Sequence, residues 1–442
     1  MSQAQRAERT VPGATRDGRP APAPRPWLVR RLFPVLATVC LVAIGMAVTT
    51  WWGPAIVGRT TWTLPDDLWG TLVAGQRLAR LDLAGLYTQP TGLVSLPGAA
   101  VILVPVAAII NAAGLSLQVP GPHNVNPAVW LLAGPYQIAV SCVTLFAADA
   151  IAERLGVTML KRAALAAAGA VTLWNVSVLW GHPEDAVAVG LLLYAVLALS
   201  EGRGGRSAWL TGAAVAVQPL VLLALPVMLV LVEPRRLAGY LARAAAPSTV
   251  LLAAAAAANW SATTHAVTSQ PNWPTVDHPT PWNSLAPHLS GGAVAAGPAR
   301  VLAILAACGC ALAAGRRWRA VPARGADPPD PADERQSAGW SADTLQQVVW
   351  WIAVTLALRS VFEPVMVAYY VWPVLAVALI PAARRWPHLL PTAAVTSALT
   401  FVSQATWRGE WAWWTPMVAG LALTLFFAHI PLRAGASSLR SG

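Results

Sequence analysis

Long apolar runs, nearly free of charged residues, recur between residue 32 and residue 430. Since about 20 apolar helical residues cross the roughly 30 Å hydrocarbon core of a bilayer, each long run predicts a membrane-spanning helix. The pattern predicts an all-α polytopic membrane protein with about 10–13 transmembrane helices. The expected helices cover residues 32–50, 127–150, 163–180, 186–200, 243–260, 301–314, 345–360, 365–381, 388–405 and 411–429.

Two further apolar segments do not fit a single crossing. Residues 92–118 contain Pro105 near their centre, and residues 207–232 contain Gln218-Pro219 between two basic loops. One crossing of residues 207–232 would place one of those basic loops outside. We therefore expect re-entrant or broken helices in both segments, because non-helical backbone is tolerated at membrane depth when protein surrounds it.

The composition supports this class and adds an orientation. Hydrophobic residues make up 56% of the chain, too many for a soluble protein of this size. The net charge of +11 could indicate nucleic acid, but the basic residues cluster in short loops between apolar runs, as in the positive-inside pattern, so no nucleic-acid partner is expected. Only six of the 30 Lys and Arg residues fall on the expected external side: Arg59, Arg77, Arg80, Arg300, Arg359 and Arg408.

This orientation predicts a multi-pass protein of the cell membrane with both termini in the cytoplasm. The expected organisation is a disordered tail (1–31), a membrane core (32–315) with external loops at 51–96 and 261–298, a cytoplasmic linker (316–344), C-terminal helices (345–430) and a second tail (431–442). The four cysteines lie in predicted helices, so neither a disulfide framework nor a zinc site is indicated.

The first external loop carries the first candidate chemistry. A helix is predicted from Leu64 to about Arg80, with Leu68, Leu72 and Val73 on one face, which suits a segment lying on a membrane surface. Asp66 and Asp67 stand at its start. A carboxylate beside an acceptor hydroxyl can act as a general base, whereas an Asp entering a helix can also cap free N–H groups and complement the dipole.

A second group of polar residues follows the helix expected at 163–180. His182, Glu184 and Asp185 form an external turn with Pro183, and we expect them to bind substrate. The alternative is a helix start, for which Pro and first-turn acids are typical.

Two later external segments complete the candidate site. Asp277 and His278 lie in a proline-rich loop, where an Asp-His neighbour pair could relay a proton or bind a metal. Arg359 ends a predicted helix and could hold a lipid phosphate, with Glu363 nearby. The alternative is an Arg359–Glu363 pair at helical spacing that only neutralises itself.

These residues resemble the GT-C superfamily of membrane glycosyltransferases, in particular actinobacterial polyprenyl-phosphate-mannose-dependent mannosyltransferases. The resemblance covers roughly residues 32–382. It depends on the aspartate of the first external loop, on Trp180-Gly181-His182-Pro183-Glu184-Asp185 and on residues 210–226 around Gln218-Pro219, where family members often carry Lys-Pro.

The resemblance implies inverting transfer of a sugar from a polyprenyl-phosphate donor to a lipid or glycan acceptor on the external face. Asp66 or Asp67 would be the base. It implies no nucleotide, and metal dependence varies in the family, so a divalent metal stays an open alternative.

Two other classes of function fit parts of the pattern. A transporter or flippase for a lipid-linked sugar would use broken helices near the midplane, although the spans contain few charges for coupling ions. A non-catalytic partner of an envelope enzyme would tolerate the departure at Gln218.

Overall fold

The computed structural model describes residues 26–52, 61–88, 93, 95–117, 125–320 and 340–431. Seven helical stretches in these ranges are long and apolar enough to cross a membrane, which confirms the prediction of an α-helical polytopic membrane protein. They are Leu32–Trp51, Pro127–Arg154, Met159–Leu179, Pro183–Ser200, Pro234–Ala258, Gly297–Trp318 and Ala342–Phe362. Three shorter apolar segments are Pro219–Leu229, Ala368–Ala382 and Trp414–Ala428.

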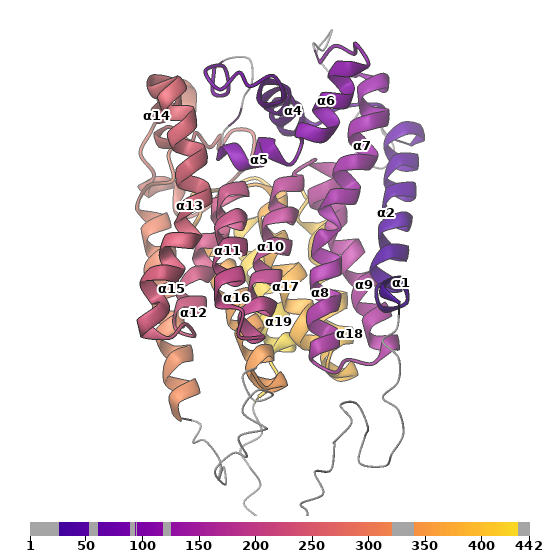
Figure 1. Ribbon diagram of the computed structural model, residues 1–442, viewed down its shortest axis with the longest axis vertical. Helices are drawn as coiled ribbons and strands as arrows, with labels where there is room; N and C mark the ends of the chain where they lie inside the picture. Colours follow the sequence, from indigo (N-terminus) through magenta and orange to yellow (C-terminus); the bar gives the residue numbers. More distant parts are fainter. Residues whose placement is uncertain are drawn as a thin grey trace, which may run out of the picture.

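Figure 1 shows the helices side by side, with α4, α5, α6 and α14 gathered at one end of the bundle. We call this the α4 end and the opposite one the α1 end. The elements of the first half are α1 (Trp27–Arg30), α2 (Leu32–Trp51), α4 (Asp66–Ala79), α5 (Pro97–Val101), α6 (Val104–Ala112), α7 (Pro127–Ser141), α8 (Val143–Arg154), α9 (Met159–Leu173), the π-helix η1 (Trp174–Leu179) and α10 (Pro183–Ser200).

The second half begins with α11 (Gly204–Val217) and ends with α19 (Trp414–Ala428). Between them lie η2 (Pro219–Ala224), α12 (Leu225–Leu229), α13 (Pro234–Ala258), α14 (Trp260–Thr268), β1 (His278–Pro279), η3 (Asn283–Leu285), η4 (Ser290–Gly292), α15 (Gly297–Ala320), α16 (Ala342–Phe362), β2 (Val365–Met366), η5 (Ala368–Val371), α17 (Trp372–Ala382) and α18 (Trp386–Val402).

Helix α10 is the centre of the bundle. Only three of its residues are not buried, and it packs against α8, α11 and α17. Its sequence is apolar on all sides after the first turn, which is the pattern expected for a helix surrounded by other helices. The first turn of α10 therefore presents its acids to protein rather than to lipid.

Both expected broken segments are broken. The first divides into α5 and α6 at Ile102-Leu103, slightly before the expected bend, because Pro105 occupies the first turn of α6 instead of the break itself. In the second, Gln218 adopts an extended backbone between α11 and η2. In Figure 1, α12 and the start of α13 lie toward the α1 end, as a hairpin of half-helices requires.

Helix α4 lies where a membrane-surface helix was expected, but its apolar face is covered by protein. Leu68 and Leu72 are fully buried in a cluster with Leu103, Ile110 and Trp130, whereas Val73 is only partly buried. The expectation that this face contacts the membrane is wrong for Leu68 and Leu72, because α5 and α6 fill the space beneath them.

Several boundaries differ from expectation. Helix α13 begins at Pro234, nine residues before the expected start at residue 243. Residues 27–30 form α1 instead of belonging to a disordered tail, and α15 continues to Ala320 into the expected linker. A helix expected from residue 365 begins later, because Val365–Met366 pairs antiparallel with His278–Pro279. This short ladder joins the second external loop to the segment before α17. Residues 1–25, 53–60, including Arg59, and 321–339 lie outside the described residues.

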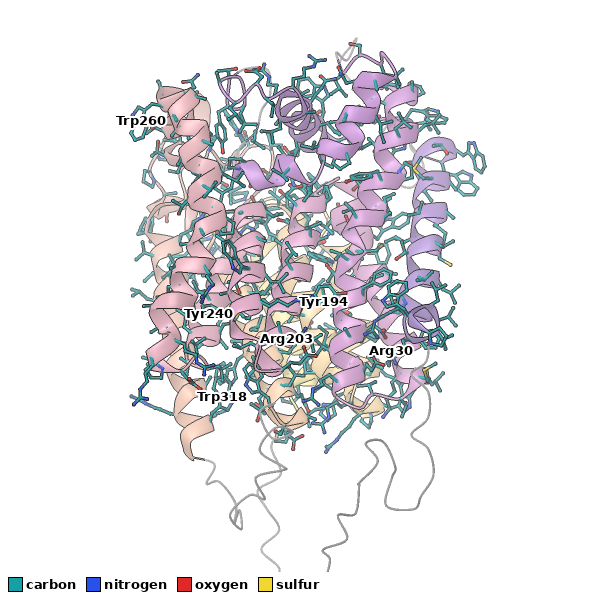
Figure 2. The ribbon with its side chains drawn as sticks, in the orientation of Figure 1. Arg30, Tyr194, Arg203, Tyr240, Trp260 and Trp318 are labelled. Carbon is teal, nitrogen blue, oxygen red and sulfur yellow. The ribbon has the colours of Figure 1, made fainter. Side chains whose placement is uncertain are left out.

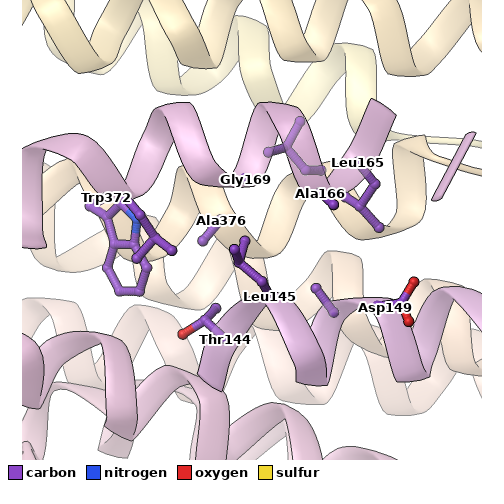
Figure 3. Close-up of a pocket in the computed structure, with 11 residues that line it drawn as sticks. Thr144, Leu145, Asp149, Leu165, Ala166, Gly169, Trp372 and Ala376 are labelled. Atoms are coloured by element: carbon purple, nitrogen blue, oxygen red, sulfur yellow. The ribbon is translucent and has the colours of Figure 1, made fainter. Parts of the chain in front are cut away.

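Aromatic and charged side chains mark the two ends of the bundle. Figure 2 places Trp260 at the α4 end, and Arg30, Arg203 and Trp318 toward the other end. Near the α1 end, Asp149 is buried and accepts two hydrogen bonds from Arg162, each 2.7 Å long. Beside Asp149, a cavity of about 10 Å³ lies between α8, α9 and α17 (Figure 3), with room for about one water molecule.

Candidate functional site

The start of α4 lies directly against the turn that precedes α10. Gly181 has a φ of +66°, and a Cβ placed there would lie 2.9 Å from Cγ of Pro65 and 3.1 Å from Cβ of Leu68. Glycine is therefore required at this position for two reasons: the backbone has a positive φ, and α4 approaches too closely for a Cβ. This contact brings Asp67 close to His182, the residue after Gly181.

His182 bridges two carboxylates. Its Nε2 lies 2.9 Å from Oδ2 of Asp67, and its Nδ1 lies 2.6 Å from Oε1 of Glu184. Both His182 and Glu184 are buried, whereas the side chain of Asp67 is 54% exposed. Asp67 is thus the member of this triad that a substrate can reach.

The imidazole of His182 is held in its charged form. Burial by itself would lower its pKa, but the adjacent Glu184 and Asp67 carboxylates outweigh burial and raise the pKa well above its ordinary value. A charged imidazole donates from both nitrogens, so it holds the two carboxylates in fixed positions.

The π-helix η1 and the segment before α17 complete the surroundings of His182. The His182 backbone N–H donates to the Val176 carbonyl at 2.8 Å, and its ring stacks on Tyr369. Asn175 in η1 donates to the Ala368 carbonyl at 3.2 Å and to Ser403 at 3.0 Å. These bonds join η1 to the chain around Tyr369.

The broken helix at Gln218 supplies a partner for Asp185. Nε2 of Gln218 donates to Oδ1 of Asp185 at 2.6 Å, and Asp185 is buried in the first turn of α10. At this position the resembled family often carries Lys-Pro. In this chain the buried Asp185 therefore accepts from the neutral amide of Gln218 instead of meeting a lysine.

Arg359, near the end of α16, has one guanidinium nitrogen that is not satisfied. Its guanidinium lies 3.8 Å from the ring centroid of Tyr370, and its Nη1 is buried with no hydrogen-bond partner. Glu363, expected to neutralise Arg359, lies 3.8 Å from it but is bound at 2.6 Å by Arg300. A buried, unsatisfied donor on a cation is expensive, and an anionic ligand would remove that penalty.

The second external loop reaches the same end of the bundle. The pKa of Asp277 is raised to about 6 by burial and by the Asp67 carboxylate, against the effect of Arg408. His278 does not face its neighbour. Its ring stacks on Trp413 at 4.5 Å, and its Nδ1 donates to the Trp407 carbonyl at 3.3 Å. Burial and nearby Arg408 lower its pKa.

The structure therefore brings Asp67, His182, Glu184 and Asp185 into one cluster and places Arg359 within electrostatic range of it. Asp66 is exposed in the first turn of α4, where both acids complement the helix dipole. Pro65, not an Asp, occupies the N-cap position. The predicted roles of all these residues stay predictions.

Three contributors were missed by sequence reasoning: Tyr369, Tyr370 and Arg300. Both tyrosines lie in η5, which the hydropathy pattern assigned to a helix, and nothing in their local sequence separates them from interface aromatics. Arg300 was assigned to the external side, but its partner Glu363 was not evident, since the two are 63 residues apart.

No group of three or more His, Cys, Asp or Glu side chains among the described residues is arranged to hold a metal ion. Comparison with known proteins finds neither a matching family model nor a matching curated protein.

Proposed function

We propose that this chain is a membrane glycosyltransferase of the GT-C type. It transfers a sugar, with mannose as the first candidate, from a polyprenyl-phosphate donor to a lipid or glycan acceptor of the cell envelope. The reaction takes place at the α4 end, which faces the outside of the cell membrane, while the α1 end and both termini face the cytoplasm.

One observation carries the proposal. A half-exposed carboxylate, Asp67, and an arginine with a buried and unsatisfied Nη1, Arg359, lie at the same end of the bundle around the His182–Tyr369 pair. Tyr369 is within electrostatic range of both. A glycosyl transfer from a phosphate donor needs these two groups, a base for the acceptor and a cation for the leaving phosphate.

In the proposed reaction, Asp67 takes the proton from the acceptor hydroxyl, and that oxygen attacks the anomeric carbon of the sugar. The bond from this carbon to the phosphate oxygen breaks, and polyprenyl phosphate leaves with the bonding electrons. Arg359 stabilises the charge on the leaving phosphate through Nη1. Inversion follows from attack on the face opposite the leaving group.

His182 acts as a positioning residue for Asp67. A charged imidazole alone would weaken Asp67 as a base, because it stabilises the ionised carboxylate. Glu184 offsets part of that charge from the other side of the ring, at 2.6 Å. The pair therefore fixes the orientation of Asp67 without leaving an unpaired cation beside it.

The test is transfer from polyprenyl-phosphate mannose by the purified full chain, with a membrane lipid extract as acceptor. We expect Asp67→Asn to lower turnover by about 10²–10⁴-fold, the usual contribution of a general base. Asp66→Asn is the matched control, one residue away in the same helical turn, and we expect it to change turnover only a few-fold. Wild-type turnover in Asp67→Asn, or no release of mannose by the unmodified chain, would contradict the proposal.

The broken helices favour one rival, a transporter of the lipid-linked donor. A transporter moves the donor between leaflets without cleaving it, so the same preparation in vesicles distinguishes the two. Translocation of intact donor without release of mannose would favour the rival.

A further inference from the structure

An apolar groove of about 400 Å³ runs along the outside of the bundle between α2 and α9. Its lining consists of apolar side chains and one cysteine, and it includes Phe33, Leu36, Ile44, Ala163, Ala167 and Phe401. Several of these remain at least half exposed, including Leu36, Ile44 and Phe401. The groove therefore opens toward the surroundings of the bundle and not into its core.

Both walls of the groove belong to stretches that are long and apolar enough to cross a membrane. Along α2 the groove extends from Phe33 to Ile44, which at 1.5 Å per residue is about 16 Å. This is close to half of the roughly 30 Å hydrocarbon core. The groove thus has the length of one acyl chain in one leaflet.

The end of the groove at Phe33 and Ala163 meets a charged cluster. Arg30 and Arg31 immediately precede the α2 wall, and Lys161 and Arg162 immediately precede Ala163 on the α9 wall. The cluster contains two acids, Asp149 and Glu153, which are bound by Arg31, Arg162 and Arg30. Three arginines against two acids leave an excess of positive charge where a lipid headgroup would lie.

The arginines differ in their access to a ligand. Arg162 and Arg31 are largely buried on Asp149, whereas the Arg30 side chain is 49% exposed. Lys161 falls on another face of α9 than the groove-lining residues and donates to the Arg384 carbonyl at 2.9 Å. Arg30 is therefore the group that can reach a phosphate at the end of the groove.

We propose that this groove is a binding site for an anionic glycerophospholipid of the leaflet at the α1 end. One acyl chain lies between α2 and α9, and the phosphate lies against Arg30. An anionic headgroup is selected over a zwitterionic one, because the amine of the latter would add positive charge to an already positive cluster. The site is remote from the Asp67–His182 cluster, so it is independent of the proposed transferase activity.

The test is native mass spectrometry of the full-length chain in detergent, titrated with phosphatidylglycerol or with phosphatidylcholine of the same acyl chains. We expect roughly fivefold tighter binding of phosphatidylglycerol, as one basic contact at a membrane surface would give. In the variant Arg30→Gln we expect the two lipids to bind equally. Arg236→Gln, an arginine of α13 with a 74% exposed side chain, is the charge control and should keep the preference.

A second variant tests the acyl-chain groove. Ala167 is exposed on α9 within the groove, so Ala167→Trp fills the groove without disturbing the core and should weaken binding of both lipids. Leu305→Trp, at an exposed position of α15 outside the groove, is its control and should leave binding unchanged. Equal affinity of the unmodified chain for the two lipids would overturn the proposal. A preference that persists in Arg30→Gln, or unaltered binding in Ala167→Trp, would also overturn it. Thermal melting of each variant establishes that it is folded.

Discussion

The rings of His182 and Tyr369 stack with their centroids 4.0 Å apart and an interplanar angle of 24°. A cation on the face of an aromatic ring is stabilised by the ring quadrupole, so Tyr369 supports the charged form that Glu184 and Asp67 favour. The stack also holds the segment before α17 over the start of α10. One contact therefore links the electrostatics of the cluster to the packing of the C-terminal helices.

This stack predicts that two substitutions of Tyr369 differ in their effect on transfer activity and its pH dependence. Tyr369→Phe keeps a ring over the imidazole and should leave transfer within a few-fold of wild type. Tyr369→Leu removes the cation–π interaction, worth about 1 kcal/mol, and should shift the alkaline limit of activity to lower pH by somewhat less than one pH unit. The pH–rate profiles of the two variants check this, and identical profiles would contradict a role for the stack.

Gly181 and Gly156 form a matched pair for testing the contact between α4 and α10. Both have positive φ, +66° and +72°, so an alanine at either costs about 1–2 kcal/mol of backbone strain. Only at Gly181 would the new Cβ also meet Pro65, at 2.9 Å, whereas nothing lies within 4 Å at Gly156.

We therefore expect both alanine variants to melt at lower temperature, with the larger decrease for Gly181→Ala. Only Gly181→Ala should also lose transfer activity, because α4 and Asp67 must move away from His182. Thermal melting and turnover of the two purified variants provide the measurement. Equal loss of activity in both variants would show that strain alone, and not the position of α4, is responsible.

Arg359 predicts an effect on donor affinity. In Arg359→Gln the unsatisfied Nη1 is lost, and with it a charge-assisted hydrogen bond of about 1.5–3 kcal/mol, so KM for the donor should rise roughly 10–100-fold. Arg80→Gln, an exposed arginine at the same end that binds Asn111, should leave KM unchanged. Unchanged KM in a folded Arg359→Gln variant would remove Arg359 from the donor site.

Asp277 predicts a pH dependence of stability. Its pKa is raised to about 6 in the folded chain from an ordinary value of 3.8. Between these values the folded state binds more protons than the unfolded state, so this residue lowers stability as pH rises from about 4 to about 6. Asp277→Asn should remove that decrease, as measured by thermal melting across this pH range.

Two charged residues that act on the pKa of Asp277, Arg408 and Asp67, can be substituted to test the causes of its shift. Arg408→Gln removes a charge that lowers the pKa of Asp277 and should move the decrease to higher pH. Asp67→Asn removes a charge that raises this pKa and should move the decrease to lower pH. Melting curves that respond to neither variant would contradict the assigned causes.

The amino-acid sequence by itself was sufficient for the class of protein and for most of its helices. Apolar runs such as Leu32–Trp51 report the hydrocarbon environment directly, because each residue contributes to transfer from water independently of its distant neighbours. Pro105 and Gln218-Pro219 likewise indicated broken helices, because proline restricts the local backbone. The distribution of charge grouped Asp67 and His182 at one boundary before any contact between them was known.

Only the tertiary structure decided which of these side chains meet. Asp67 and His182 are 115 residues apart, and their contact depends on the absence of a Cβ at Gly181. Tyr369 joins the cluster, and Arg300 meets Glu363, through packing between segments that no local pattern encodes. Hydropathy and periodicity describe the surroundings of each segment, whereas a site of this kind arises from distances between segments, which are set by how the side chains of neighbouring helices fit together.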